Sequence, residues 1–121
     1  MIKTVLELPF DSASIYESEF DYFGKDDIVI KLFYLGENNE KHVLKLIYEE
    51  ALVYQNTGER CAWGWQNESW ETISEIQDSP WLKELRAVYP EVDFSCKHIS
   101  MVLNDIGCID IACKDLRIER A

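Results

Sequence analysis

Two apolar runs dominate the pattern of hydrophobic and polar positions in the first half of the chain. Asp27–Leu35 and residues 42–48 are rich in β-branched and aromatic residues, and the short polar segment 36–40 separates them. Two such runs joined by a turn that contains glycine and asparagine predict a β-hairpin. Apolar residues occupy both faces of the two strands, so we expect the hairpin to lie inside a sheet and not at its edge.

A second hairpin is predicted near the C-terminus. Residues 96–103 and 108–113 form the two apolar runs, and residues 104–107 tolerate the backbone angles that a reversal of the chain requires. With a four-residue loop, His98 would lie directly opposite Cys113, and both side chains would share one face of the sheet.

A helix over about residues 79–89 is predicted by its capping residues and its periodicity. Asp78 and Ser79 offer a side-chain oxygen to the first turn, and Pro80 stands where its missing N–H costs nothing. Apolar residues then recur on one face until Pro90 ends the segment. We expect this helix to pack on the sheet.

The remaining segments are less regular. Residues 4–8 and the alternation around Leu116 and Ile118 predict a first and a last strand. Segment 66–77 fits both a helical and a strand period, and we interpret it as a short strand that leads into the helix. We expect residues 11–25 to form an irregular loop rich in acidic and aromatic side chains.

Length and composition fit one globular domain. The chain has 121 residues, of which 47% are hydrophobic and 29% charged. We therefore predict a single α+β domain over residues 1–121: an antiparallel, meander-like β-sheet of about five to seven strands, with the main helix at about 79–89 packed on it.

Charge points to a class of partner. The 23 acidic and 12 basic residues give a formal net charge of -11, and segments 1–27 and 59–93 hold nearly all of it. Such a field repels nucleic acid and anionic membranes and attracts cationic proteins, although solubility alone can also explain it.

Aromatic side chains accompany the acidic ones in both segments. Tyrosine and tryptophan are frequent in the hot spots of protein interfaces, but tryptophans at positions 63, 70 and 81 can equally fill the core. The candidate partner-binding residues combine carboxylates with two aromatic side chains: Glu17, Glu19, Asp21, Tyr22, Asp26, Trp65, Glu68 and Glu71.

Catalytic and cofactor motifs do not emerge. The five glycines form no phosphate-binding loop, and no Gly-x-Ser-x-Gly sequence occurs. His98 and Cys113 are candidates for a Cys–His nucleophile or, with Cys96 and Cys108, for a metal site, but their spacing differs from that of zinc fingers and ribbons. We expect no catalytic residue, metal or cofactor, with a small-molecule enzyme that uses the Cys–His pair as an alternative.

Location is inferred from the absence of export and membrane patterns. No apolar stretch is long enough to cross a bilayer, and Glu7 interrupts the apolar start of the chain. We expect a cytoplasmic protein with no membrane or direct nucleic-acid contact, and with reduced cysteines that form no disulfide. The sequence does not predict the oligomeric state.

Two stretches carry a resemblance to a known group of proteins. Asp78-Ser79-Pro80-Trp81-Leu82 precedes a strand that bears His98, and the turn Asp105-Ile106-Gly107-Cys108 follows. Roughly a third of the chain thereby resembles small bacterial immunity proteins of contact-dependent and polymorphic toxin systems. The resemblance implies an inhibitor that covers the active surface of a cognate basic toxin domain, such as a nuclease. The alternative is an acidic regulator or nucleic-acid mimic that occupies a DNA-binding protein.

Overall fold

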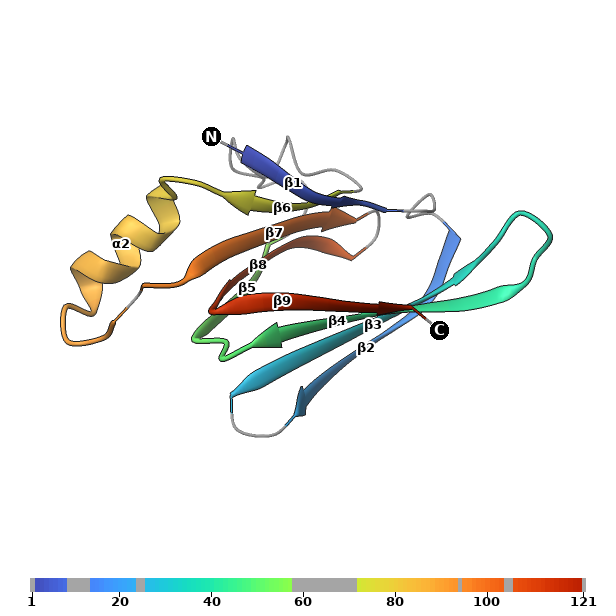
Figure 1. Ribbon diagram of the computed structural model, residues 1–121, viewed down its shortest axis with the longest axis horizontal. Helices are drawn as coiled ribbons and strands as arrows, with labels where there is room; N and C mark the ends of the chain where they lie inside the picture. The colour runs from blue at the N-terminus through green and yellow to red at the C-terminus, as the bar shows by residue number, and fades with distance from the viewer. Residues whose placement is uncertain are drawn as a thin grey trace.

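Two antiparallel sheets face each other across a shared core (Figure 1). The structure is a computed structural model, and it describes residues 2–8, 14–23, 26–57, 72–93, 95–103 and 106–120. The five-stranded sheet has the order β1 (Ile2–Glu7), β6 (Thr72–Ile76), β7 (Lys97–Leu103), β8 (Gly107–Cys113) and β5 (Val53–Thr57). The four-stranded sheet has the order β2 (Ile15–Phe23), β3 (Asp27–Leu35), β4 (Lys41–Glu49) and β9 (Asp115–Arg120).

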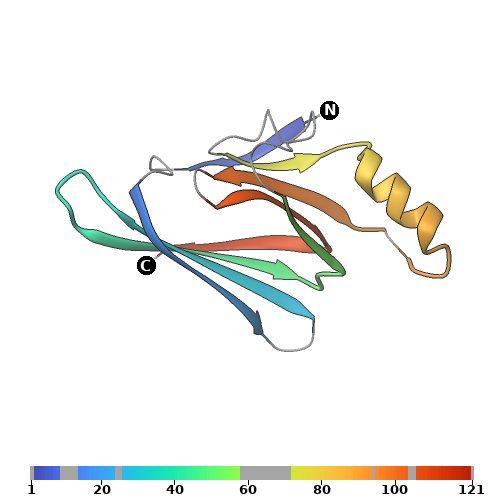
Figure 2. The same ribbon diagram turned by 180° about the vertical axis from the view of Figure 1, so that it is seen from behind.

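The core lies between the inner faces of the two sheets. Alternate residues of β3, such as Ile30 and Leu32, are fully buried there, and Met101 of β7 and Ile109 of β8 reach the same cluster from the other sheet. Burial of these apolar side chains is the main force that holds the sheets together. The view from behind shows the same two layers (Figure 2).

The first predicted hairpin is confirmed. Strands β3 and β4 are the two central strands of their sheet, as the apolar residues on both faces predict. The N–H of Gly36 donates to the carbonyl of Glu40 at 2.9 Å and closes the turn. Asn39 lies in the left-handed region with φ 60°, which asparagine adopts more readily than most residues.

The second hairpin forms, but the predicted register is wrong. Lys97 pairs with Cys113, and His98 pairs with Ala112, because β8 already begins at Gly107. That glycine has φ 111°, a conformation that other residues rarely adopt. A shift of one residue moves every side chain to the opposite face, so His98 and Cys113 lie on different faces of the sheet.

The predicted helix is confirmed as α2 (Pro80–Val88), with Ser79 as its N-cap. The Ser79 hydroxyl accepts a hydrogen bond from the N–H of Leu82 at 3.1 Å. Trp81 and Leu82 pack with Ala112 on the outer face of the five-stranded sheet. The helix therefore covers only one end of that sheet (Figure 1). It is the only helix in the described ranges, and it is too short to cross a membrane.

Two expectations about the sheet are wrong. The antiparallel sheets and the helix agree with the α+β class, but the described residues form nine strands in two sheets where about five to seven strands in one meander were predicted. The expected loop over residues 11–25 contains the nine-residue strand β2. Its three acidic residues occupy every second position, and this period of two is the pattern of a strand.

Candidate protein-binding site

Strand β2 presents a row of three carboxylates at the edge of the four-stranded sheet. Glu17, Glu19 and Asp21 occur at every second position, so their side chains point to the same, outer face, and all three are exposed. We call these three residues the acidic row. The structure thus brings together three of the predicted partner-binding residues on one face of one strand.

One member of the acidic row, Glu19, belongs to a line of four charged residues that crosses the sheet. In the register of the sheet, Glu19 lies opposite Lys31, Lys31 opposite Lys45, and Lys45 opposite Glu119. The two carboxylates balance the two ammonium groups, so the middle of this outer face is nearly neutral in sum, although Lys31 and Lys45 are like charges on neighbouring strands. Glu17 and Asp21 lie opposite the apolar residues Phe33 and Val29 instead. Their negative charge has no cation directly across the ladder.

Two of the described aromatic side chains of β2 are partly exposed, one near the acidic row and one on the opposite face of the strand. Tyr16 is 47% exposed, and its ring lies 6.3 Å from that of Phe33, with the amino group of Lys41 at 5.9 Å from the Tyr16 ring. Phe20 is 40% exposed, but it lies opposite the core residue Ile30. Its side chain therefore points to the face away from the acidic row, where it makes an edge-to-face contact at 5.9 Å with Tyr54 of β5. Near Tyr16, a carboxylate and an exposed aromatic face together offer a cationic side chain both an opposite charge and a cation–π contact.

The other predicted partner-binding residues do not all join this surface. Asp26 is exposed in the turn between β2 and β3, with φ 76°. Tyr22 belongs to β2, and its side chain lies outside the described atoms. Trp65, Glu68 and Glu71 lie outside the described residues. The acidic row and Asp26 are therefore the part of the predicted site that the structure places.

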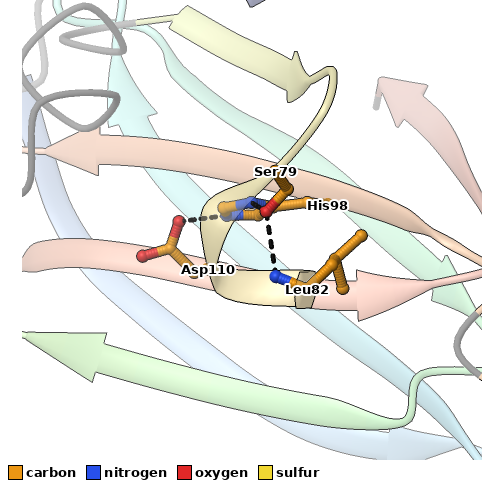
Figure 3. A network of polar contacts seen from close by, with 4 residues as sticks. All are labelled: Ser79, Leu82, His98 and Asp110. Carbon is orange, nitrogen blue, oxygen red and sulfur yellow. Dashed lines mark hydrogen bonds and ion pairs between the residues drawn. The ribbon is translucent and has the colours of Figure 1, made fainter. Parts of the chain in front are cut away.

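A second polar constellation is buried under α2 (Figure 3). The imidazole of His98 lies between Asp110 and Ser79: its Nε2 is 2.6 Å from Asp110 Oδ1, and its Nδ1 is 2.6 Å from Ser79 Oγ. His98 and Asp110 are fully buried, and Ser79 is 4% exposed. The sequence patterns identified Ser79 as a helix cap and His98 as a candidate residue. Asp110 is distant from both along the chain, and only the pairing of β7 with β8 brings it next to His98.

The hydrogen-bond roles in this network follow from the chemistry of its groups. The Asp110 carboxylate accepts the Nε2 proton of His98, and in the neutral imidazole Nδ1 then accepts the hydroxyl proton of Ser79. Ser79 still accepts the N–H of Leu82. Both ring nitrogens of His98 and the Ser79 hydroxyl thus have partners, and the network fastens the start of α2 to the five-stranded sheet.

The network also has the order of a serine-hydrolase triad, and two observations bear on that chemistry. Ser79 and His98 lie in the wall of a cavity of about 290 Å³ that Lys83, Arg86 and Lys97 also line. However, a nucleophile must reach its substrate, and the Ser79 hydroxyl is nearly covered and already caps the helix. Helix anchoring explains its position without a substrate.

The predicted Cys–His pair does not form. Both ring nitrogens of His98 face Asp110 and Ser79, whereas Cys113 points into the core between the sheets. Burial raises the pKa of the Cys113 thiol to about 12, and it raises that of Cys96 as well. Thiols with raised pKa values stay protonated at neutral pH and are poor nucleophiles. Cys96, Cys108 and Cys113 carry reduced thiols and belong to no disulfide.

Metal binding finds no support in the described ranges. No group of three or more histidine, cysteine, aspartate or glutamate side chains there has the geometry to hold an ion.

Comparison with known proteins provides no relative. No protein-family model, no curated protein and no solved structure matches this chain.

Proposed function

We propose that this chain is an immunity-type inhibitor that binds a basic toxin domain through the acidic row and covers its active surface. The observation that carries the proposal is the placement of Glu17, Glu19 and Asp21 on one exposed face of strand β2. The net charge of -11 and the resemblance of segments around Ser79 and His98 to immunity proteins support it.

Charge of this kind acts first on the rate of association. An acidic surface attracts a cationic protein over a distance of about 10 Å at moderate ionic strength and orients it before contact. Toxin domains that cleave nucleic acids carry basic active surfaces, because they must hold phosphates. A row of carboxylates on a firm sheet can occupy such a surface and exclude the substrate.

The direct test is protection of cells from a toxin. The test requires that a gene adjacent to that of this chain encode a basic toxin domain. That domain is then produced together with the wild-type chain or with the triple variant Glu17→Lys, Glu19→Lys, Asp21→Lys. We expect growth with the wild type and growth arrest with the triple variant.

A matched control distinguishes the effect of the acidic row from the effect of net charge. The variant Glu37→Lys, Glu84→Lys, Glu91→Lys reverses three exposed carboxylates elsewhere, so it changes the net charge equally. It should protect as the wild type does. If both variants lose protection equally, or if neither the wild type nor the control protects, the proposal is contradicted. If the wild-type chain inhibits a DNA-binding protein and does not protect against a toxin, the regulator alternative is favoured.

Hydrolysis by Ser79, His98 and Asp110 is a second candidate function, favoured by the two 2.6 Å contacts and the adjoining cavity. A fluorophosphonate probe reacts with activated serines and tests it directly. Labelling of the wild type that is lost in Ser79→Ala and in His98→Ala would establish the activity. We expect no labelling, because the Ser79 hydroxyl is buried.

A further inference from the structure

Strand β2 is an open edge of the four-stranded sheet. Within the described ranges it pairs only with β3, and both views show it as the outermost strand of its layer (Figures 1 and 2). From Glu17 to Phe23 its register is regular, with the only shift between Ile15 and Glu17. An edge strand of this kind leaves a line of backbone donors and acceptors without strand partners.

The other edges are less suited to receive a strand. Strand β1 has a register shift between Thr4 and Leu6, and β5 is only five residues long. Strand β9 has six residues and carries both signs of charge, with Arg117 and Glu119 forming an ion-pair contact at 3.7 Å. Strand β2 has nine residues, and the charged ones are all acidic.

The ladder of β3 and β4 shows which backbone groups of β2 face the open side. The bond from Gly36 N–H to the carbonyl of Glu40 marks a hydrogen-bonded pair at the end of this ladder. Successive residues of a strand direct their backbone N–H and C=O groups to opposite neighbours. The even-numbered residues of β3 therefore direct these groups to β4, and the odd-numbered residues direct them to β2.

The residues of β2 divide accordingly. The odd-numbered residues of β3 pair with the acidic row, so Glu17, Glu19 and Asp21 direct their backbone groups to β3. The backbone groups of the residues between them therefore point to the open edge: Ser18, Phe20 and Tyr22. A strand added at this edge would bond to these three residues and lie beside the carboxylates of the acidic row.

Charge selects what can pair there. Two copies of β2 side by side would place carboxylates next to carboxylates, and like charges on neighbouring strands repel. A strand with lysine or arginine at every second position would instead meet opposite charges, while its backbone bonds to the open edge.

We propose that β2 receives an extended, basic strand of the partner protein as a fifth strand of its sheet. The inference rests on the proposed function and specifies how the partner binds: backbone hydrogen bonds to Ser18, Phe20 and Tyr22, and charge pairs with the acidic row. The occupant is a protein segment with cationic side chains at alternate positions.

Amide hydrogen exchange tests the geometry. In the free protein, the N–H groups of Glu17, Glu19 and Asp21 should exchange more slowly than those of Ser18, Phe20 and Tyr22. The probe is a capped nine-residue peptide of alternating lysine and threonine at low ionic strength. It should slow exchange at Ser18, Phe20 and Tyr22 by about tenfold or more, and a peptide of alternating glutamate and threonine should not. Failure of the lysine peptide to bind, or binding without this slowing, overturns strand addition.

A proline variant separates strand addition from the proposed function. Ser18→Pro removes one N–H from the open edge and keeps every carboxylate, and proline is tolerated at such edge positions. It should weaken binding of the lysine peptide and of the toxin domain by about tenfold or more, and Ser18→Thr should not.

If Ser18→Pro binds the toxin domain normally while reversal of the acidic row abolishes binding, strand addition is wrong and the proposed function stands. If the wild type does not bind the toxin domain, the proposed function fails. The exchange experiment on the wild type tests the geometry even if Ser18→Pro does not fold.

Discussion

At the scale of single residues, the buried pair of His98 and Asp110 is the most consequential feature. A carboxylate without contact to water is unfavourable unless a donor satisfies it, and His98 Nε2 lies 2.6 Å from Asp110 Oδ1. Removal of the imidazole leaves that carboxylate without this donor. The cost of the substitution therefore exceeds that of the lost hydrogen bond alone.

We predict that His98→Ala lowers the free energy of unfolding by about 3 kcal/mol or more. Ser100→Ala is the matched control, because Ser100 lies on the same strand face, is equally buried and has no hydrogen-bond partner for its hydroxyl in the described part of the chain. It should be neutral or slightly stabilising. Urea unfolding followed by fluorescence measures both. Equal effects of the two substitutions would show that the network contributes nothing specific.

Burial of the Cys113 thiol gives a prediction for alkaline pH. Its pKa rises from the ordinary value of 9.0 to about 12, so the folded chain holds the proton where the unfolded chain releases it. The resulting stabilisation is complete below pH 9 and is lost progressively as the pH rises from 9 toward 12. Cys113→Ala should therefore make the free energy of unfolding fall less steeply between pH 9 and pH 10. Parallel slopes for the wild type and the variant would contradict this.

At the scale of elements, strands with strong local patterns could be predicted from the sequence. The β3–β4 hairpin and α2 follow from β-branched runs, turn residues and capping chemistry, which all act between near neighbours. Strand β2 was missed because its acidic composition was taken as typical of a loop, although residues 15–23 alternate with a period of two. Composition misled where periodicity would have identified the strand.

The β3–β4 turn offers a test at this scale. Asn39 has φ 60°, which β-branched residues adopt only with strain. We expect Asn39→Val to lower the free energy of unfolding by about 1–2 kcal/mol, and Asn39→Gly to leave it nearly unchanged. Urea unfolding of the two variants measures the difference. An equal loss in both would mean that the Asn39 side chain, not its backbone angle, stabilises the turn.

At the scale of the whole molecule, the arrangement of the strands depends on long-range pairing and could not be predicted from local sequence patterns. The division into two sheets and the order of their strands depend on contacts between residues far apart in the chain. The β7–β8 register differed from the prediction by one residue, and this alone separated His98 from Cys113 and placed His98 beside Asp110. Hence the Cys–His pair that was considered as an alternative does not form. The residues of the acidic row could be predicted, but their position on an edge strand could not.

The same scale explains how the charge is used. Three of the seven acidic residues of segment 1–27 lie on an edge strand of the sheet and not on a loop beside it. A firm strand fixes the spacing of its carboxylates, so less entropy is lost when a partner binds. The acidic row is thus a preformed surface with an open backbone edge next to it.

The rate of association with the toxin domain as a function of salt tests this account most directly. The wild type and the control Glu37→Lys, Glu84→Lys, Glu91→Lys should associate rapidly at low salt and about tenfold or more slowly at high salt. The variant Glu17→Lys, Glu19→Lys, Asp21→Lys should associate slowly throughout, with little dependence on salt. Association of this variant at the rate of the control, at every salt concentration, would contradict the assignment of the binding surface to β2.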